Sequence, residues 1–223
     1  MKRIVEPELL DTLPPDDSRA IRSRRDLRRV NWRMGNYTIM ANALRENFSG
    51  LPKQITELGA GDGDFLLRVA QKLNWPDIEA VLLDRQKAIS AETLAAFPKM
   101  NWRVETIIAD AFQWDGAAEI VIANMFLHHF ENPKLAQLLQ KIFERANLFV
   151  AVEPRRSAWP LFCSRLLWMI GCNGVTCHDA TISVRAGFLC DEISALWPDK
   201  NDWQLTEQPA GLFSHLFIAR RLK

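Results

Sequence analysis

Three glycines at alternate positions, preceded by an acid, are the residues of this sequence with the clearest chemical purpose. The stretch contains Glu57, Gly59, Ala60, Gly61 and Gly63. Glycine accepts positive φ and lets a ligand approach the main chain, and the N–H groups that begin a following helix can bind an anionic part of that ligand. A dinucleotide fingerprint would need glycine at position 64, which is Asp64. The turn is therefore expected to bind a nucleotide-like ligand other than a dinucleotide.

Polar residues also stand where three further predicted strands end. Asp84 closes a buried run 21 residues after Gly63, near the spacing at which an acid reaches a ribose hydroxyl pair. Asp110 can accept from an adenine amine, with Phe112 packing the ring. Each acid alone could be a strand-end cap, but ligands of doubly wound sheets bind outside the carboxyl ends of the strands. The candidate ligand-binding residues here are Asp84, Arg85, Asp110, Ala111, Phe112, Asn124 and Met125.

Strands and helices that could position these residues alternate along the chain. Strand-like runs occupy residues 54–58, 78–83, 102–109, 119–127 and 148–152, and a final strand pair is predicted at 203–209 and 212–220. Helical spacing follows the glycine turn, and a second amphipathic helix follows Asn132 and Pro133. The alternation predicts an α/β fold with a doubly wound, mostly parallel sheet. Residues 155–186, which include an apolar helix at 159–170, interrupt this alternation. We expect them to form an insertion over the carboxyl edge of the sheet.

The first 50 residues form a separate section, an extended arm followed by helices. The helix at about 19–34 holds seven arginines and one acid, Asp26, and Leu27, Val30 and Met34 mark its expected buried stripe. Its arginines are either a solvated face, a lid over the ligand, or a dock for an acidic carrier protein or anionic substrate. We therefore divide the chain into an arm and helical lid (1–50) and a core (51–223) with a cap insertion (155–186).

Composition places the chain among ordinary globular proteins. Of its 223 residues 48% are apolar and 25% charged, and the net charge of +1 gives no general attraction to nucleic acid or membrane. Residues 1–10 have no secretory pattern, and no apolar run is long enough to span a bilayer. The four cysteines lack C-x-x-C spacing, which indicates reduced thiols, a cytoplasmic location and no metal site.

The glycine pattern, with the strand-end residues in order, resembles motif I of the class I methyltransferases over roughly residues 30–220. The resemblance implies S-adenosylmethionine as cofactor, S-adenosylhomocysteine as product, and seven strands in the order 3-2-1-4-5-7-6 with the last antiparallel. An acidic turn suits a cationic sulfonium ligand. On spacing grounds, Arg33 is expected to meet the carboxylate of the cofactor.

Two further runs narrow the resemblance within that class. The run Asn124-Met125-Phe126-Leu127-His128-His129-Phe130 is similar to motif IV of ubiquinone/menaquinone-type C- and O-methyltransferases. The segments that begin at Glu153 and at His178 resemble small-molecule methyltransferases encoded beside polyketide or fatty-acid-type synthases. This implies a role in small-molecule biosynthesis and secondary metabolism, with a hydrophobic hydroxylated or carboxylated acceptor of polyketide, aromatic or quinone type.

Methyl transfer from a sulfonium is an in-line displacement, so the protein must mainly align the acceptor and the methyl group. A phenol or enol acceptor also needs a base, and histidine is the usual one near neutral pH. The candidates are His128, His129 and His178, with Asp179 or Glu153 as an orienting or basic carboxylate, and the position of His178 in the insertion favours it. The candidate acceptor-binding residues are His129, Glu153, Arg155, Trp159, Phe162 and Arg185.

Two other functions remain open. One is a cofactor-binding scaffold partner that docks through the arginine helix, and the other is a protein or RNA methyltransferase. The absence of an Asn/Asp-Pro-Pro-Tyr run after the fourth strand disfavours the amine of a base or glutamine as acceptor. The main hypothesis predicts a monomer or homodimer with a small-molecule acceptor, either free or on an acidic carrier protein, and does not favour nucleic acid.

Overall fold

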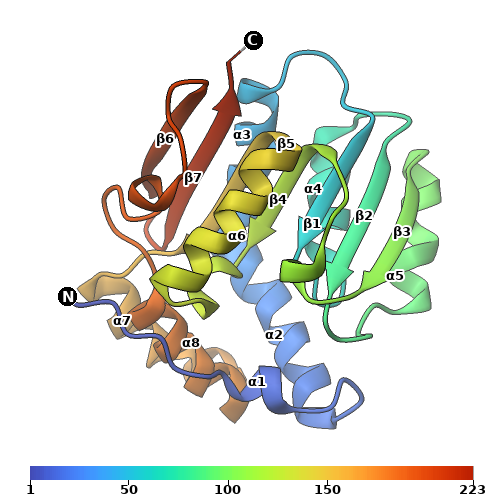
Figure 1. The fold of residues 1–223 in the computed structure, drawn as a ribbon. Coiled ribbons are helices and arrows are strands. Elements are labelled where there is room, and N and C mark those ends of the chain that lie inside the picture. Colours follow the sequence, from blue (N-terminus) through green and yellow to red (C-terminus); the bar gives the residue numbers. More distant parts are fainter. Residues whose placement is uncertain (223) are drawn as a thin grey trace.

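Seven strands make one sheet in the order β3-β2-β1-β4-β5-β7-β6 (Figure 1), in a computed structural model that describes residues 1–222. The strands are β1 (Gln54–Leu58), β2 (Glu79–Asp84), β3 (Arg103–Ile108), β4 (Ala118–Asn124), β5 (Ala146–Pro154), β6 (Trp203–Ala210) and β7 (Ser214–Arg221). β1 to β5 pair in parallel, and β7 is antiparallel to both β5 and β6. The predicted strand order and the antiparallel last strand are both confirmed.

Helices cover both faces of the sheet, and each face has its own apolar core. α3 (Asn36–Asn47), α4 (Asp64–Leu73) and α5 (Ala91–Ala96) lie on one face, where Met40 and Leu66 are fully buried. α6 (Asn132–Arg145) lies on the other, and its Leu138 packs in a cluster with Phe149 of β5. The central strands are rich in Ile and Val because both faces are covered.

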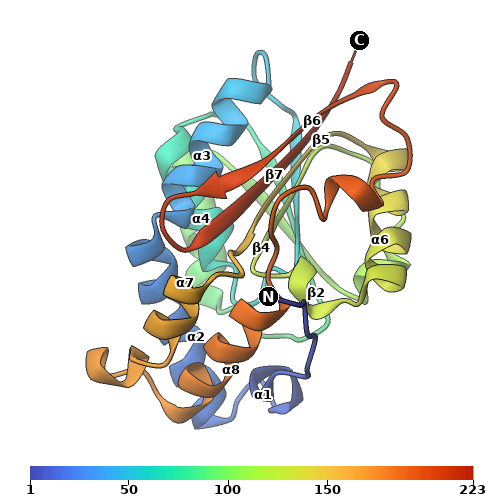
Figure 2. The same ribbon diagram turned by 90° about the vertical axis from the view of Figure 1, so that its left-hand side faces the viewer.

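A cap of helices lies beyond the carboxyl ends of the strands, in the lower part of Figures 1 and 2. It joins α1 (Leu9–Thr12) and α2 (Ser18–Met34) from the start of the chain to α7 (Ala158–Ser164) and α8 (Gly174–Ala186) from the insertion. The chain also forms the short helices η1 (Phe97–Met100), η2 (Ala111–Gln113), η3 (Leu127–His129), η4 (Leu167–Ile170) and η5 (Ser194–Leu196). Segments more than 100 residues apart in sequence thus enclose the edge where parallel strands end.

Three local predictions were wrong. The apolar run 159–170 forms α7 and η4 with a break between them, and not one helix. The fourth strand ends at Asn124 because Met125 adopts a left-handed φ of 52°. The buried face of α2 differs from the predicted apolar stripe, since Leu27 is only half-buried whereas Asp26 is buried.

This difference in the buried face has a physical cause, because α2 packs on α8 through polar groups. The Asp26 carboxylate accepts from the Asn173 N–H at 2.7 Å and from the Thr176 hydroxyl at 3.3 Å, and it pairs with Arg29. Apolar periodicity therefore could not identify the buried face of this helix.

Among the described residues, no helix combines the length and hydropathy that a membrane crossing requires.

Candidate functional site

The glycine turn between β1 and α4 has the conformation that its sequence requires. Gly59, Gly61 and Gly63 have φ of 70°, 57° and 74°, in the left-handed region that favours glycine. The N–H groups of Gly59 and Ala60 donate to the Leu83 carbonyl at 2.9 and 3.0 Å, which ties the turn to β2. The turn is thus a fixed cradle at the centre of the carboxyl edge.

Glu57, the acid before the turn, is fully buried beside the cradle. Burial raises the pKa of its carboxyl well above the usual value, and the nearby carboxylates of Asp62, Asp84 and Asp64 act in the same direction. Among the described residues, nothing forms a hydrogen bond to its Oε2. A buried oxygen without a partner is costly, so this atom fits a donor group supplied by a ligand.

Asp84 lies where the sequence placed it, at the end of β2 and against the glycine turn. Its carboxylate accepts from the Gly61 N–H at 2.8 Å and from the Gln86 N–H at 2.7 Å. The Gln86 amide accepts from Arg24 of α2 and donates to the Asp11 carbonyl, both at 3.3 Å. These contacts bring the cap directly over the end of β2.

Aromatic side chains line the neighbouring strand ends. Asp110 caps η2 by accepting from the Phe112 N–H at 2.9 Å, and the Phe112 ring packs edge-on to Phe130 at 5.3 Å. Phe126 packs on the same Phe130 ring at 5.2 Å. A Cβ at Gly59 would come within 2.3 Å of the Phe126 ring, so this ring lies directly on the glycine turn.

Asn124, at the end of β4, joins the sheet to the N-terminal helices. Its amide oxygen accepts from Asn36 at 3.3 Å, and its amide nitrogen donates to Asn31 of α2 at 3.2 Å. Met125 follows in a left-handed conformation that is uncommon for a residue with a side chain. Such backbone strain is often concentrated at functional sites, and here it turns the chain toward His128.

The cap reaches the glycine turn through Arg28. This guanidinium pairs with Asp62 at 2.8 Å and lies 3.7 Å from Asp64. Arg33, which we expected at the cofactor, is exposed, and its guanidinium lies 5.8 Å from the Trp32 ring centroid. The sequence marked the helix as a possible lid, but seven similar arginines gave no signal for which one turns inward.

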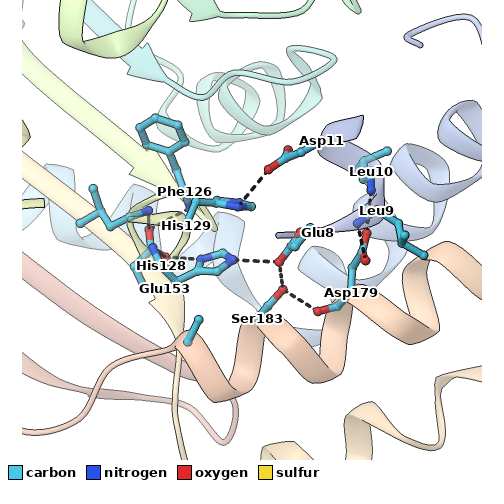
Figure 3. Close-up of polar contacts among 12 residues, drawn as sticks. Glu8, Leu9, Leu10, Asp11, Phe126, His128, His129, Glu153, Asp179 and Ser183 are labelled. Atoms are coloured by element: carbon cyan, nitrogen blue, oxygen red, sulfur yellow. Dashed lines mark hydrogen bonds and ion pairs between the residues drawn. The ribbon is translucent and has the colours of Figure 1, made fainter. Parts of the chain in front are cut away.

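His128 is the centre of a buried polar cluster at the end of β4 (Figure 3). Its Nδ1 lies 2.8 Å from Glu153, a fully buried carboxylate that also accepts from the N–H groups of Phe126 and Leu127 at 3.0 and 2.8 Å. Burial opposes ionisation of Glu153, yet the hydrogen bond from His128 and these N–H groups hold its pKa below the usual value. The His128 ring is therefore fixed by its hydrogen bond to Glu153.

The second carboxylate of the cluster comes from the N-terminal arm. Glu8 lies 3.3 Å from His128 Nε2 and accepts from the Ser183 hydroxyl. Burial lowers the pKa of His128, but its partners Glu153 and Glu8 outweigh burial and raise it to about 9. Next to it, His129 Nδ1 lies 3.3 Å from the Asp11 carboxylate. Sequence reasoning missed Glu8 and Asp11, because no motif marks residues that lie more than 100 positions from their partners.

The structure gives His178 and Asp179 a different setting. The two oxygens of Asp179 accept from the N–H groups of Leu9 and Leu10, both at 2.9 Å, so this acid anchors α1 to α8. The side chain of His178 is 49% exposed and bonds Asp179 at 2.9 Å. Among the described residues, no hydrogen bond or ion pair joins His178 to the strand ends.

The predicted acceptor-binding residues lie in three different settings. His129 and Glu153 belong to the cluster, whereas Trp159 and Phe162 are 55% and 54% exposed and stack on each other on the outer side of α7. The remaining two are partly buried: Arg155 pairs with Phe188 through the main chain, and the carbonyl of Arg185 accepts from the Ile4 N–H.

Comparisons with known proteins agree with this architecture. Residues 55–147 match the family model described as "Methyltransferase domain". The plantazolicin methyltransferase BpumL, solved with SAH, aligns over 92% of this chain and 91% of its own with a TM-score of 0.63 and 14% identity. An O-methyltransferase family protein from Burkholderia thailandensis aligns over 93% and 61% with a TM-score of 0.62 and 16% identity.

Magnesium protoporphyrin IX methyltransferase (ChlM) from Synechocystis PCC 6803, solved with SAH, aligns over 85% of this chain and 83% of its own with a TM-score of 0.55 and 13% identity. No curated protein sequence gives a significant match. The sheet order is that of the class I methyltransferase fold, and residues 55–147 match a methyltransferase domain. Residues 55–147 thus form a methyltransferase domain, and the glycine cradle and the unpartnered Glu57 oxygen fit S-adenosylmethionine as its cofactor.

Proposed function

We propose that the protein is an S-adenosylmethionine-dependent methyltransferase that acts on a small, hydrophobic, hydroxylated or carboxylated acceptor of polyketide, aromatic or quinone type from secondary metabolism. One observation carries the proposal, namely that the phenylalanines at 112, 126 and 130 adjoin a single polar cluster at the end of β4. Small-molecule sites are mostly apolar with a few placed polar groups. An apolar acceptor with one polar oxygen suits such a site.

Two structural neighbours support a small-molecule acceptor. BpumL is a plantazolicin methyltransferase solved with desmethylPZN analogues, and ChlM is named for magnesium protoporphyrin IX. A carrier-bound form of the acceptor remains part of the proposal, because Arg22 and Arg25 are exposed on α2 and could dock an acidic carrier protein.

The residues that would hold the cofactor follow from the strand ends. Asp84 would accept from the ribose hydroxyls, Asp110 and Phe112 would hold the adenine, and Glu57 with the glycine turn would meet the amino-acid part. When bound, S-adenosylmethionine supplies an electrophilic methyl group and yields S-adenosylhomocysteine. Arg28, through its pairs with Asp62 and Asp64, holds α2 over the turn.

The histidine cluster would activate the acceptor oxygen. His128 is almost completely buried and is held as a cation between Glu8 and Glu153, so it positions the cluster without reaching the acceptor. His129 has 21% of its side chain exposed. The acceptor oxygen would therefore bind on the His129 side of the cluster. The Asp11–His129 pair on this side would take the proton of the acceptor hydroxyl, and the acceptor oxygen would then be aligned with the methyl group.

The first test supplies methyl-deuterated S-adenosylmethionine to the purified protein in host extract, with mass spectrometry of small molecules, protein and RNA. Label in an apolar metabolite supports the proposal, and label only in protein or RNA overturns it. With that acceptor in hand, His129→Ala should lower kcat at least tenfold while cofactor Kd stays unchanged. His178→Ala should keep kcat within about twofold, and the reverse pattern would move the acceptor to α8.

A further inference from the structure

We propose that Glu8, His128 and His129 bind one divalent transition-metal ion, with Zn²⁺ as the ion that their chemistry favours. The ligand atoms of these three side chains all lie within 4.8 Å of one another, in the region shown in Figure 3. Two imidazoles and one carboxylate are a ligand set of catalytic zinc sites, in which a fourth position stays open for water or substrate. The cysteine spacing predicted no metal site, but this cluster contains no cysteine, so that spacing does not bear on it.

The distance between the two most buried ligands supports a bridging ion. Glu8 Oε1 and His128 Nε2 are 3.3 Å apart. A direct charge-assisted hydrogen bond is usually shorter, at about 2.7–2.9 Å, as seen on the other side of the ring, where Nδ1 lies 2.8 Å from Glu153. Two ligands on a tetrahedral ion with bonds of about 2.1 Å are roughly 3.4 Å apart. The partly exposed His129 supplies the third ligand atom, within 4.8 Å of the other two.

Carboxylates behind the ligands provide the outer shell of a metal site. Ligating histidines almost always donate the other ring N–H to a carboxylate or carbonyl, which fixes the ring. Glu153 does this for His128 and is itself held by the main-chain N–H groups of residues 126 and 127. The Asp11 carboxylate lies 3.3 Å from His129 Nδ1, and the Ser183 hydroxyl donates to Glu8. Each of the three ligands therefore has its own supporting group.

The charges around the cluster also favour a cation. Glu8, Asp11 and Glu153 bring three carboxylates to the two imidazoles. Arg3 is the nearby arginine that donates to main-chain carbonyls of this segment, at His128 and Phe130. A divalent ion in place of the proton on His128 Nε2 would add one positive charge to a region that holds three carboxylates.

A bound ion would give the open side of the cluster a role in methyl transfer, and that role rests on the proposed function. The ion would face the site on the His129 side, which is the exposed one. An acceptor oxygen in the open coordination position would have its hydroxyl pKa lowered and its direction fixed by the ion. Ion binding itself requires no acceptor, so it can be measured separately.

The decisive experiment titrates Zn²⁺ into chelator-treated, full-length protein by calorimetry. We expect one ion per chain, and we expect His129→Ala and Glu8→Gln each to weaken Zn²⁺ binding by more than the roughly 10- to 100-fold that loss of an outer-shell partner costs. His178→Ala is the matched control, because it removes a more exposed carboxylate-paired histidine and should leave Zn²⁺ binding unchanged. His128→Ala is avoided, since it would leave Glu153 buried and unpaired.

Thermal melts without metal establish that each variant is folded, and Co²⁺ absorption provides a second measurement. His129→Ala should abolish the tetrahedral Co²⁺ spectrum, whereas His178→Ala should keep it. Absence of stoichiometric binding, or equal binding in all variants, would overturn the metal site. If methyl transfer then persists with chelator present, the proposed function holds without the metal site. If the protein binds metal but labels no small molecule, the metal site stands and the proposed function fails.

Discussion

The position of His128 between two carboxylates predicts how the stability of the protein depends on pH. Its pKa of about 9 in the fold exceeds the ordinary value of 6.5. A raised pKa means that the folded state holds the proton more tightly than the unfolded state. The resulting stabilisation is fully present below pH 6.5, and it is lost as pH rises through about 9. The difference corresponds to about 3 kcal/mol, because each pKa unit is worth about 1.4 kcal/mol.

Glu8→Gln removes the charge of one of the two partners and keeps a side chain of the same shape. The variant should start less stable at pH 6, and it should lose only about half as much stability between pH 6.5 and 9, on the order of 1–2 kcal/mol. Urea unfolding at closely spaced pH values, with a chelator present, measures both curves. Glu144→Gln, an exposed change of the same charge on α6, is the control and should follow the wild type.

The comparison of curves isolates His128 from other groups that titrate in this range. If the wild type and Glu8→Gln lost the same free energy of unfolding between pH 6.5 and 9, Glu8 would not raise the pKa of His128. A wild-type curve that rises across this window would refute the ion-pair account of the cluster, because the sign would then be reversed.

Three further predictions concern the parts that position the site. Gly59→Ala should lower stability by about 1–3 kcal/mol and abolish cofactor binding in calorimetry, since its Cβ meets Phe126 at a positive φ; a normal Kd would contradict the packing. Asp26→Asn should cost about 1–3 kcal/mol in urea unfolding by weakening buried hydrogen bonds to α8, and a change under 0.5 kcal/mol would argue against them. Arg28→Ala should leave stability within about 1 kcal/mol, because the pair is partly exposed, but should speed cofactor dissociation in stopped flow. An unchanged off-rate would remove the lid role.

The fold was predictable because its signals are local and repeated. Buried strands alternate with amphipathic helices, and the glycine pattern fixes where β1 meets α4. Asp84 and Asn124 could be placed for the same reason, since parallel strands bring their carboxyl ends to one edge. The acid that bonds the glycine turn, Asp84, followed from strand order alone.

The rest of the site depends on contacts between distant segments, which no local pattern encodes. Glu8 meets a histidine 120 residues further along the chain, and Arg28 is one of several equivalent arginines. His178 looked suitable because it stands beside an acid in the insertion, but Asp179 serves the main chain of α1. Residue type and spacing could not separate an anchoring acid from one that faces a ligand.

The contacts of the N-terminal arm also set the order in which the protein can be completed during synthesis. Leu9 and Glu8 bind α8 residues that are 170 and 175 positions later, and Arg3 binds the Ala186 carbonyl 183 positions later. The arm therefore leaves the ribosome long before its partners exist, while strands β1 to β4 can already pair. Contacts of such sequence separation form late in folding. A nascent or truncated chain that lacks α8 would hold the glycine cradle without the closed histidine cluster.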